Sequence, residues 1–134
     1  MKLKLFAALV FAVSAAACGS VVDPSQNVTD NFNGTLTPAS QGGGPFIYSF
    51  NASKSGEYSI EVVSTTPATT SNIIGVGFGQ MISGSCSPIT FNGLATVGHT
   101  GSAGAIQPGS WCAVVYDPGV LTQSTAFTAW VKHP

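Results

Sequence analysis

The sequence predicts an all-β domain, an antiparallel β-sandwich or jelly roll of about eight short strands, preceded by a signal peptide. Apolar and polar residues alternate in short runs, which is the pattern of strands with one buried face. Glycine, proline, asparagine and serine interrupt these runs at regular intervals, and no segment beyond the first 17 residues has helical periodicity. Such strands bury their apolar faces by packing as two sheets, so the pattern favours a sandwich.

Residues 1–17 have the three-part layout of a secretory signal peptide. Lys2 and Lys4 make the beginning positive, residues 5–13 are an unbroken apolar run, and residues 14–17 are small. The apolar run is too short to span a bilayer as a helix of the mature protein. We therefore expect this segment to direct export and to be removed.

Cys18 follows this segment directly and is one of three cysteines. An odd number of cysteines in an exported protein leaves one thiol to be explained. The sequence Ala16-Ala17-Cys18 resembles the end of a bacterial lipoprotein signal, with Ala15 where that family usually has leucine. The resemblance implies that Cys18 carries a diacylglyceryl group, becomes the mature N-terminus and anchors the protein in a membrane of the bacterial cell envelope. Two or more acyl chains make such an attachment stable.

The residues beside Cys18 refine this expectation. Gly19 rather than aspartate follows it, which by resemblance to sorted lipoproteins indicates the outer membrane of a cell with two membranes. The alternative is ordinary cleavage after Ala17, because residues 15–17 are themselves an A-x-A exit. Residues 19–27 are polar, contain proline and lack periodicity, so residues 18–28 are predicted to be the lipidated cysteine and a flexible tether. Residues 29–134 are then the sandwich domain.

The chain beyond the signal is poor in charge. Two lysines stand there against five acidic residues, arginine is absent from the whole sequence, and charged residues make up only 7% of it. Recognition of nucleic acids and phosphates relies on clusters of Arg and Lys, so the composition argues against a nucleic-acid partner. The polar surface must instead come from Ser, Thr, Asn, Gln and Gly.

The alternation predicts eight strands, over residues 31–37, 45–51, 56–64, 72–80, 86–91, 94–98, 110–116 and 124–132. The clearest is residues 56–64, where Tyr58, Ile60 and Val62 share one face and Glu57, Ser59 and Glu61 share the other. In residues 45–51, Phe46, Tyr48 and Phe50 share a face. The turn composition of residues 51–56 predicts a hairpin between these two strands.

The later strands are marked by turns and glycines. Residues 64–72 are rich in Thr and Ser and predict a loop, and the glycines of residues 72–80 indicate a bulge or a close backbone approach. Two turns, Pro108-Gly109 and residues 117–119, bound the buried strand 110–116. In the closing strand, Phe127, Ala129 and Val131 face away from Ala126, Thr128 and Trp130.

The order of these segments is similar to that of bacterial pre-peptidase C-terminal domains over roughly residues 30–133. The motif Phe46-x-Tyr48-x-Phe50, followed by A-x-x-x-G-x-Y from residue 52, resembles their opening, and residues 108–116 resemble their x-G-x-Y-Y-x-x-V strand. The aspartate-rich middle strands of that family are missing here. The resemblance implies a jelly-roll-like sandwich in an exported protein and an accessory module without catalysis.

Cys86 and Cys112 remain for a disulfide once Cys18 is assigned to the anchor. Their bridge would close a loop of about 27 residues, which the chain-entropy model values at roughly 3.5 kcal/mol. A reactive or metal-binding thiol pair is the alternative. The sequence has no C-x-x-C spacing and no histidine at zinc-like spacing beside either cysteine, so a structural bridge is favoured.

No catalytic, cofactor or metal site is predicted. His99 and His133 are expected to be loop or terminal residues, and Ser102 misses the G-x-S-x-G elbow at its first glycine. Glu57 and Glu61 share a strand face and could do glycosidase chemistry, but a solvated face explains them better. The possible calcium ligands, which form no EF-hand loop, are Asp30, Asn31, Asn33 and Asp117.

The aromatic residues offer the one candidate ligand contact. A sandwich needs large side chains between its sheets, so most of Tyr48, Tyr58, Trp111 and Tyr116 should lie in the core. Trp130 lies opposite the apolar face of its strand and is the best exposed candidate to stack on a sugar or another apolar ligand.

The sequence thus favours a non-catalytic, envelope-anchored module that binds a polysaccharide, an envelope component or a protein. The alternative is a secreted hydrolase whose site is assembled from dispersed residues, with His99 beside a carboxylate and a serine.

Overall fold

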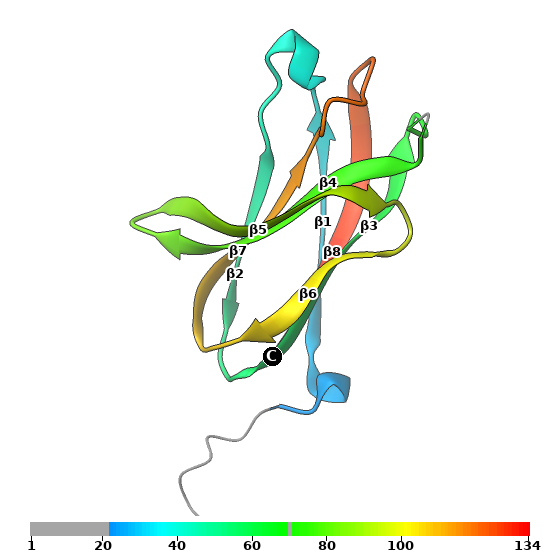
Figure 1. Ribbon diagram of the computed structural model, residues 1–134. Coiled ribbons are helices and arrows are strands. Elements are labelled where there is room, and N and C mark those ends of the chain that lie inside the picture. The colour runs from blue at the N-terminus through cyan, green and yellow to red at the C-terminus, as the bar shows by residue number, and fades with distance from the viewer. Residues whose placement is uncertain (1–21, 70) are drawn as a thin grey trace, which may run out of the picture.

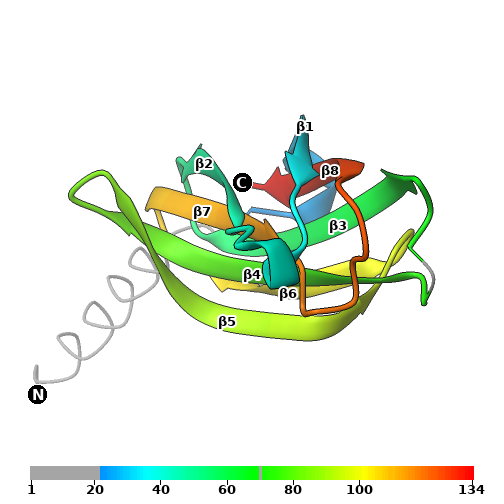
Figure 2. The same ribbon diagram turned by 90° about the horizontal axis from the view of Figure 1, so that it is seen from above.

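The computed structural model describes residues 22–69 and 71–134 as two four-stranded antiparallel sheets packed face to face (Figures 1 and 2). The sandwich expected from the sequence is therefore confirmed. The predicted signal peptide and the predicted lipidation site at Cys18 lie outside the described residues. In the described part of the chain, no helix is long and apolar enough to cross a membrane.

The eight strands are β1 (Val28–Leu36), β2 (Phe46–Ala52), β3 (Gly56–Thr66), β4 (Ile73–Ile82), β5 (Ser85–Thr96), β6 (Thr100–Ile106), β7 (Gly109–Tyr116) and β8 (Thr125–His133). Sheet 1 has the order β1-β8-β3-β6 and sheet 2 the order β2-β7-β4-β5. The strands thus pair as 1 with 8, 2 with 7, 3 with 6 and 4 with 5, which is the nested pairing of a jelly roll. Two short 3-10 helices, η1 (Pro24–Gln26) and η2 (Ala39–Gln41), precede β1 and β2.

The hairpin predicted between residues 45–51 and 56–64 is wrong. β2 pairs with β7 in sheet 2, whereas β3 pairs with β6 and β8 in sheet 1. The residues between them form an arch that carries the chain from one sheet to the other. Turn composition marks a change of direction but does not distinguish an arch from a hairpin, because both need the same turn-forming residues.

The middle of the domain also differs from the prediction. The two weak strands over residues 86–91 and 94–98 are one strand, β5, whose pairing with β4 is interrupted by two register shifts. The glycines of β4 explain one of them, because a Cβ at Gly79 would collide with the backbone of Ser87 and Pro88. β6 was not predicted, since its small residues carry little strand propensity. Tertiary packing forms it, with Gly101 against Val76.

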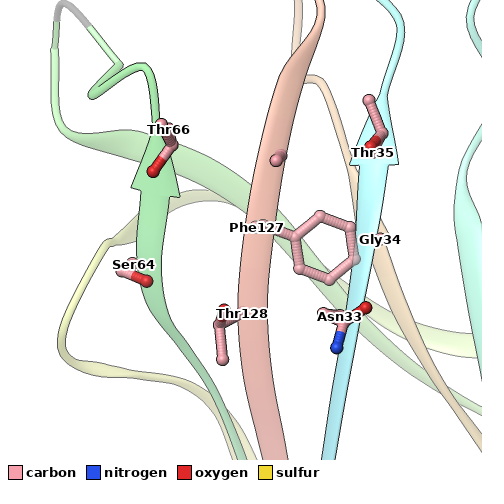
Figure 3. A pocket seen from close by; sticks show the side chains of 8 residues that line it. Asn33, Gly34, Thr35, Ser64, Thr66, Phe127 and Thr128 are labelled. Carbon is pink, nitrogen blue, oxygen red and sulfur yellow. The ribbon is translucent and has the colours of Figure 1, made fainter.

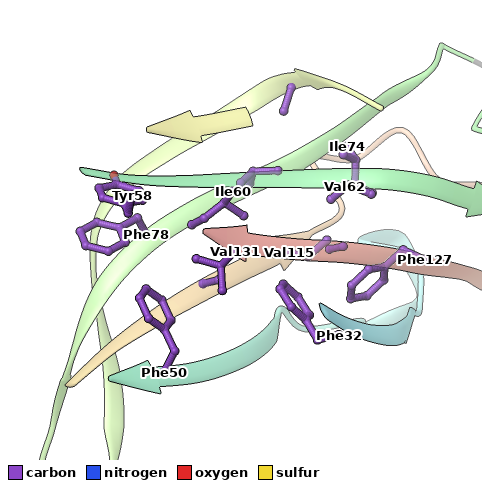
Figure 4. Close-up of a cluster of buried hydrophobic side chains, with 14 of the residues drawn as sticks. Phe32, Phe50, Tyr58, Ile60, Val62, Ile74, Phe78, Val115, Phe127 and Val131 are labelled. Atoms are coloured by element: carbon purple, nitrogen blue, oxygen red, sulfur yellow. The ribbon is translucent and has the colours of Figure 1, made fainter. Parts of the chain in front are cut away.

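The core fills the space between the sheets with aliphatic and aromatic side chains from all the strands (Figure 4). The alternation predicted for β3 is confirmed, because Tyr58, Ile60 and Val62 are buried. The rings of Tyr58, Phe78 and Trp111 stack in series, with centroids 3.8 Å and then 5.0 Å apart. This stack joins β3 of sheet 1 to β4 and β7 of sheet 2, so it ties the two layers together.

The disulfide between Cys86 and Cys112 is present, with the two Cα atoms 6.0 Å apart. Cys86 lies on β5 opposite Met81, and Cys112 lies on β7 opposite Gly79. Strand β4 therefore runs between the two bridged strands. The bridge fastens the long β4–β5 hairpin to the middle of sheet 2.

Asp117 directly follows β7, and its carboxylate connects η2 with the loop between β7 and β8. Oδ1 accepts the backbone N–H groups of Gly119, Val120 and Leu121 at 2.8–3.0 Å, and Oδ2 accepts that of Ala39 at 2.8 Å. Burial by itself raises the pKa of Asp117, but these four backbone hydrogen bonds outweigh it and hold the pKa below its ordinary value. The carboxylate thus pins η2 to the β7–β8 loop.

Asp117→Asn should lower the free energy of unfolding by about 2–3 kcal/mol at neutral pH, because the N–H groups lose a charged acceptor and one of the two accepting oxygens becomes an NH2 donor. The folded pKa lies below the unfolded one, so this contribution is complete above about pH 4 and disappears as the pH falls through the folded pKa. Urea unfolding at neutral pH and at about pH 3 measures it. Asp23→Asn is the matched control, since among the described residues the Asp23 carboxylate accepts hydrogen bonds from Ser25 alone. Equal stability of the Asp117 variant and the wild type at neutral pH would contradict this role.

Candidate binding face

The residues considered for hydrolysis do not come together. His99 is exposed in the turn between β5 and β6. Ser102 lies on β6, and its hydroxyl is 3.2 Å from that of Tyr58. Glu57 and Glu61 lie on the solvent side of β3, as the alternation predicted. Among the described residues, the side-chain hydrogen bond of Ser102 therefore leads to a tyrosine and not to a histidine base.

His133, expected to be a loop or terminal residue, is next to the C-terminal residue and belongs to β8. It ends β8 with 5% of its surface exposed and packs against the ring of Phe50, with centroids 4.7 Å apart. Its Nε2 lies 3.2 Å from Oδ2 of Asp30, and the hydroxyl of Tyr48 donates to the same oxygen at 3.3 Å. Desolvation and the neighbouring Asp30 charge raise the pKa of Tyr48. This cluster joins β1, β2 and β8, and the sequence separation of 103 residues hid it from pattern analysis.

The two carboxylates among the suggested calcium ligands, Asp30 and Asp117, lie on different elements and are engaged in other contacts. Asp30 faces His133 and Tyr48, and Asp117 accepts backbone N–H groups of the loops. Over residues 22–69 and 71–134, no three His, Cys, Asp or Glu side chains stand close enough to hold a metal ion.

The solvent side of sheet 1 is organised in rows across β1, β8 and β3. We call this surface the Trp130 face. Its rows, from the antiparallel register, are Asn31–Trp130–Glu61, Asn33–Thr128–Ser64 and Thr35–Ala126–Thr66. Strands in a sheet lie about 4.8 Å apart and alternate residues on one strand about 6.8 Å apart, so the rows form a grid. A register shift between Val62 and Ser64 interrupts this spacing on β3.

A shallow hollow of about 320 Å³ lies over the second and third rows (Figure 3). Outward side chains on β8 become smaller from Trp130 to Thr128 to Ala126. The surface is therefore highest at Trp130 and lowest at Ala126, which lies at the bottom of the hollow. Thr35 and Thr66 stand on either side of Ala126 and wall the hollow. It is open to solvent, unlike the enclosed clefts that bury most of a small ligand.

Trp130 lies on β8 beside the hollow, four residues from Ala126, and is half-buried. The ammonium of Lys132 lies 4.5 Å from the centre of its ring, in a cation–π contact. Lys132 therefore covers one face of the indole, and part of the Trp130 side chain remains exposed to solvent. The position of Trp130 on the outer side of β8, opposite Phe127 and Val131, agrees with the sequence analysis.

The hollow is polar but carries no charge. Its polar side chains come from Asn33, Thr35, Ser64, Thr66 and Thr128, all of them exposed. None of these five makes a side-chain hydrogen bond with another described residue. Sequence analysis missed them because single Ser and Thr residues on an outer face look like ordinary solvated positions. Only the register brings them together.

No protein-family model, curated protein or solved structure matches this chain.

Proposed function

We propose that this protein is an envelope-anchored lipoprotein whose jelly roll is a non-catalytic binding module, with the Trp130 face as its binding surface. The anchor is supported by the motif Ala16-Ala17-Cys18 after an export signal. It is also supported by the pairing of Cys86 with Cys112, which leaves Cys18 as the remaining cysteine. The resemblance to pre-peptidase C-terminal domains supports an accessory role.

The observation that carries the binding role is the Trp130 face itself. A half-buried aromatic side chain, an open hollow and uncommitted hydroxyl and amide groups occur together on one side of sheet 1. Convergent polar groups beside an aromatic anchor are typical of recognition surfaces. The residues considered for hydrolysis are dispersed in the described structure, so no observation there favours the hydrolase alternative.

Sedimentation with cell-envelope fragments freed of lipid tests the binding role, with the membrane-extracted protein kept in mild detergent. We expect the wild type to sediment with the fragments and Ala126→Lys, which fills and charges the hollow, to remain largely in solution. Ala103→Lys is the matched control, because Ala103 is exposed on β6 at the far edge of the same sheet. Equal sedimentation of the two variants would refute binding through the hollow.

The intact mass of the same extracted protein, measured under thiol alkylation, tests the anchor. We expect a chain that begins at Cys18 and carries acyl groups, with two thiols released only by reduction. An unacylated chain whose Cys18 reacts with the alkylating agent would show ordinary cleavage and a secreted protein.

A further inference from the structure

We propose that the Trp130 face binds an uncharged polysaccharide, with one sugar ring against the exposed part of the Trp130 ring and a following unit in the hollow over Ala126. This inference rests on the proposed binding function and names its ligand class. Four features of the face lead to it: its hydrogen-bonding groups, its charge, its length and its openness.

The hydrogen-bonding groups match those of sugars. Threonine and serine hydroxyls both donate and accept, and the amide of Asn33 offers both functions in one group. A sugar hydroxyl also does both, so either partner can supply the proton. Because the five polar side chains of the hollow are bonded to no other described residue, a ligand can engage them without breaking an internal hydrogen bond.

The charge of the face disfavours an anionic ligand. No residue of the hollow is charged, and the two charged side chains beside Trp130, Lys132 and Glu61, have opposite signs. Lys132 is already placed over the indole. A phosphate, sulfate or uronate in the hollow would lose part of its hydration and meet no cation among the lining residues. A neutral chain carries no such cost.

The length of the face favours a polymer over a single sugar. Trp130 and Ala126 are four residues apart on β8, which is about 13–14 Å along a strand. That distance exceeds one sugar ring, so a ligand that touches both must be an oligomer. The hollow is open to solvent rather than enclosed, so it does not confine a ligand to a single unit.

Affinity electrophoresis tests this ligand class in native gels that contain a soluble polysaccharide, with the extracted protein in mild detergent. The neutral probes are a β-glucan, a mannan and a xylan, and the anionic probes are alginate and polygalacturonate. We expect at least one neutral probe to retard the wild type and the anionic probes to have no effect. Trp130→Ala and Ala126→Lys should each weaken the apparent affinity about tenfold or more.

Two control variants share the chemistry of the test variants. Phe91→Ala removes an aromatic ring that is 61% exposed on β5 of sheet 2, and Ala103→Lys adds a lysine at the edge of sheet 1. Both should bind within about twofold of the wild type. Near-ultraviolet circular dichroism of each variant checks that the fold is retained, so that weaker retardation reports on the surface.

The outcomes separate this inference from the proposed function. Retardation by the anionic probes alone would overturn the neutral ligand class and leave a binding module. Equal retardation of the wild type and Trp130→Ala would overturn the assignment to this face. Without retardation in any gel, sedimentation with envelope fragments that Ala126→Lys abolishes would show that the ligand is not a polysaccharide. Failure of both assays would remove the binding function itself.

Discussion

Phe78→Ala should lower the free energy of unfolding by about 3–5 kcal/mol, which is a large share of the stability of a domain this size. Phe78 is 4% exposed and lies between the rings of Tyr58 and Trp111. Its removal leaves a cavity at the place where aromatic stacking joins the two sheets. Both neighbours lose a stacking partner, which adds to the cost of the lost burial.

Phe91→Ala is the matched control for this prediction. It removes the same side chain from the outer side of β5, where 61% of the surface of Phe91 is exposed, and should cost less than about 1 kcal/mol. Thermal unfolding followed by circular dichroism should show a fall in Tm of more than about 10 °C for Phe78→Ala and a small change for Phe91→Ala. Similar Tm values for the two variants would mean that the stack does not hold the sheets together.

Removal of the disulfide should cost about 2–5 kcal/mol, with the chain-entropy model giving roughly 3.5 kcal/mol. Cys86→Ser is the better variant, because Cys86 is partly exposed and Cys112 is fully buried. A serine at position 112 would add an unsatisfied hydroxyl and obscure the effect of the bridge. Cys86→Ser leaves the packing around Cys112 largely unchanged.

The measurement is urea unfolding of the wild type and Cys86→Ser, each with and without a reductant. We expect the reductant to destabilise the wild type to the level of the variant and to leave the variant unchanged. Ser87→Ala, one residue along β5, is the control for a change of side chain at this strand. If the reduced wild type kept its full stability, the bridge would contribute nothing to the folded state.

The fold class could be predicted because it depends on a local signal. In β3 and β8 each buried residue alternates with an outward one, so the pattern gives both the element and its inner face. The pairing of strands has no such signal. The arch between β2 and β3 and a hairpin would be built from the same residues, and only the packed sheets decide between them.

The candidate site could be predicted only where one residue carried the signal. Trp130 stands out as a large aromatic on the outer side of its strand, and Cys86 and Cys112 stand out by their number and spacing. The hollow beside Trp130 arises from cross-strand neighbours such as Asn33, Thr128 and Ser64, which are distant in sequence. Strand β6 was also missed, because its small residues are explained by their packing against Val76 and Tyr58, which are distant in sequence.

The nested pairing of the strands has a consequence for how the chain reaches this structure. Among the strands of the described residues, only β4 and β5 are both paired and adjacent in sequence, with a loop of two residues, Ser83 and Gly84, between them. Each further pair encloses the one before it, up to β1 and β8, where Val28 meets His133. Closing a loop costs more entropy as it lengthens, by about 0.6 kcal/mol for each doubling. The inner pairs shorten the effective loop for the outer ones, so the topology favours assembly from the β4–β5 hairpin outward, with the edge strand β1 joining after β8 is in place.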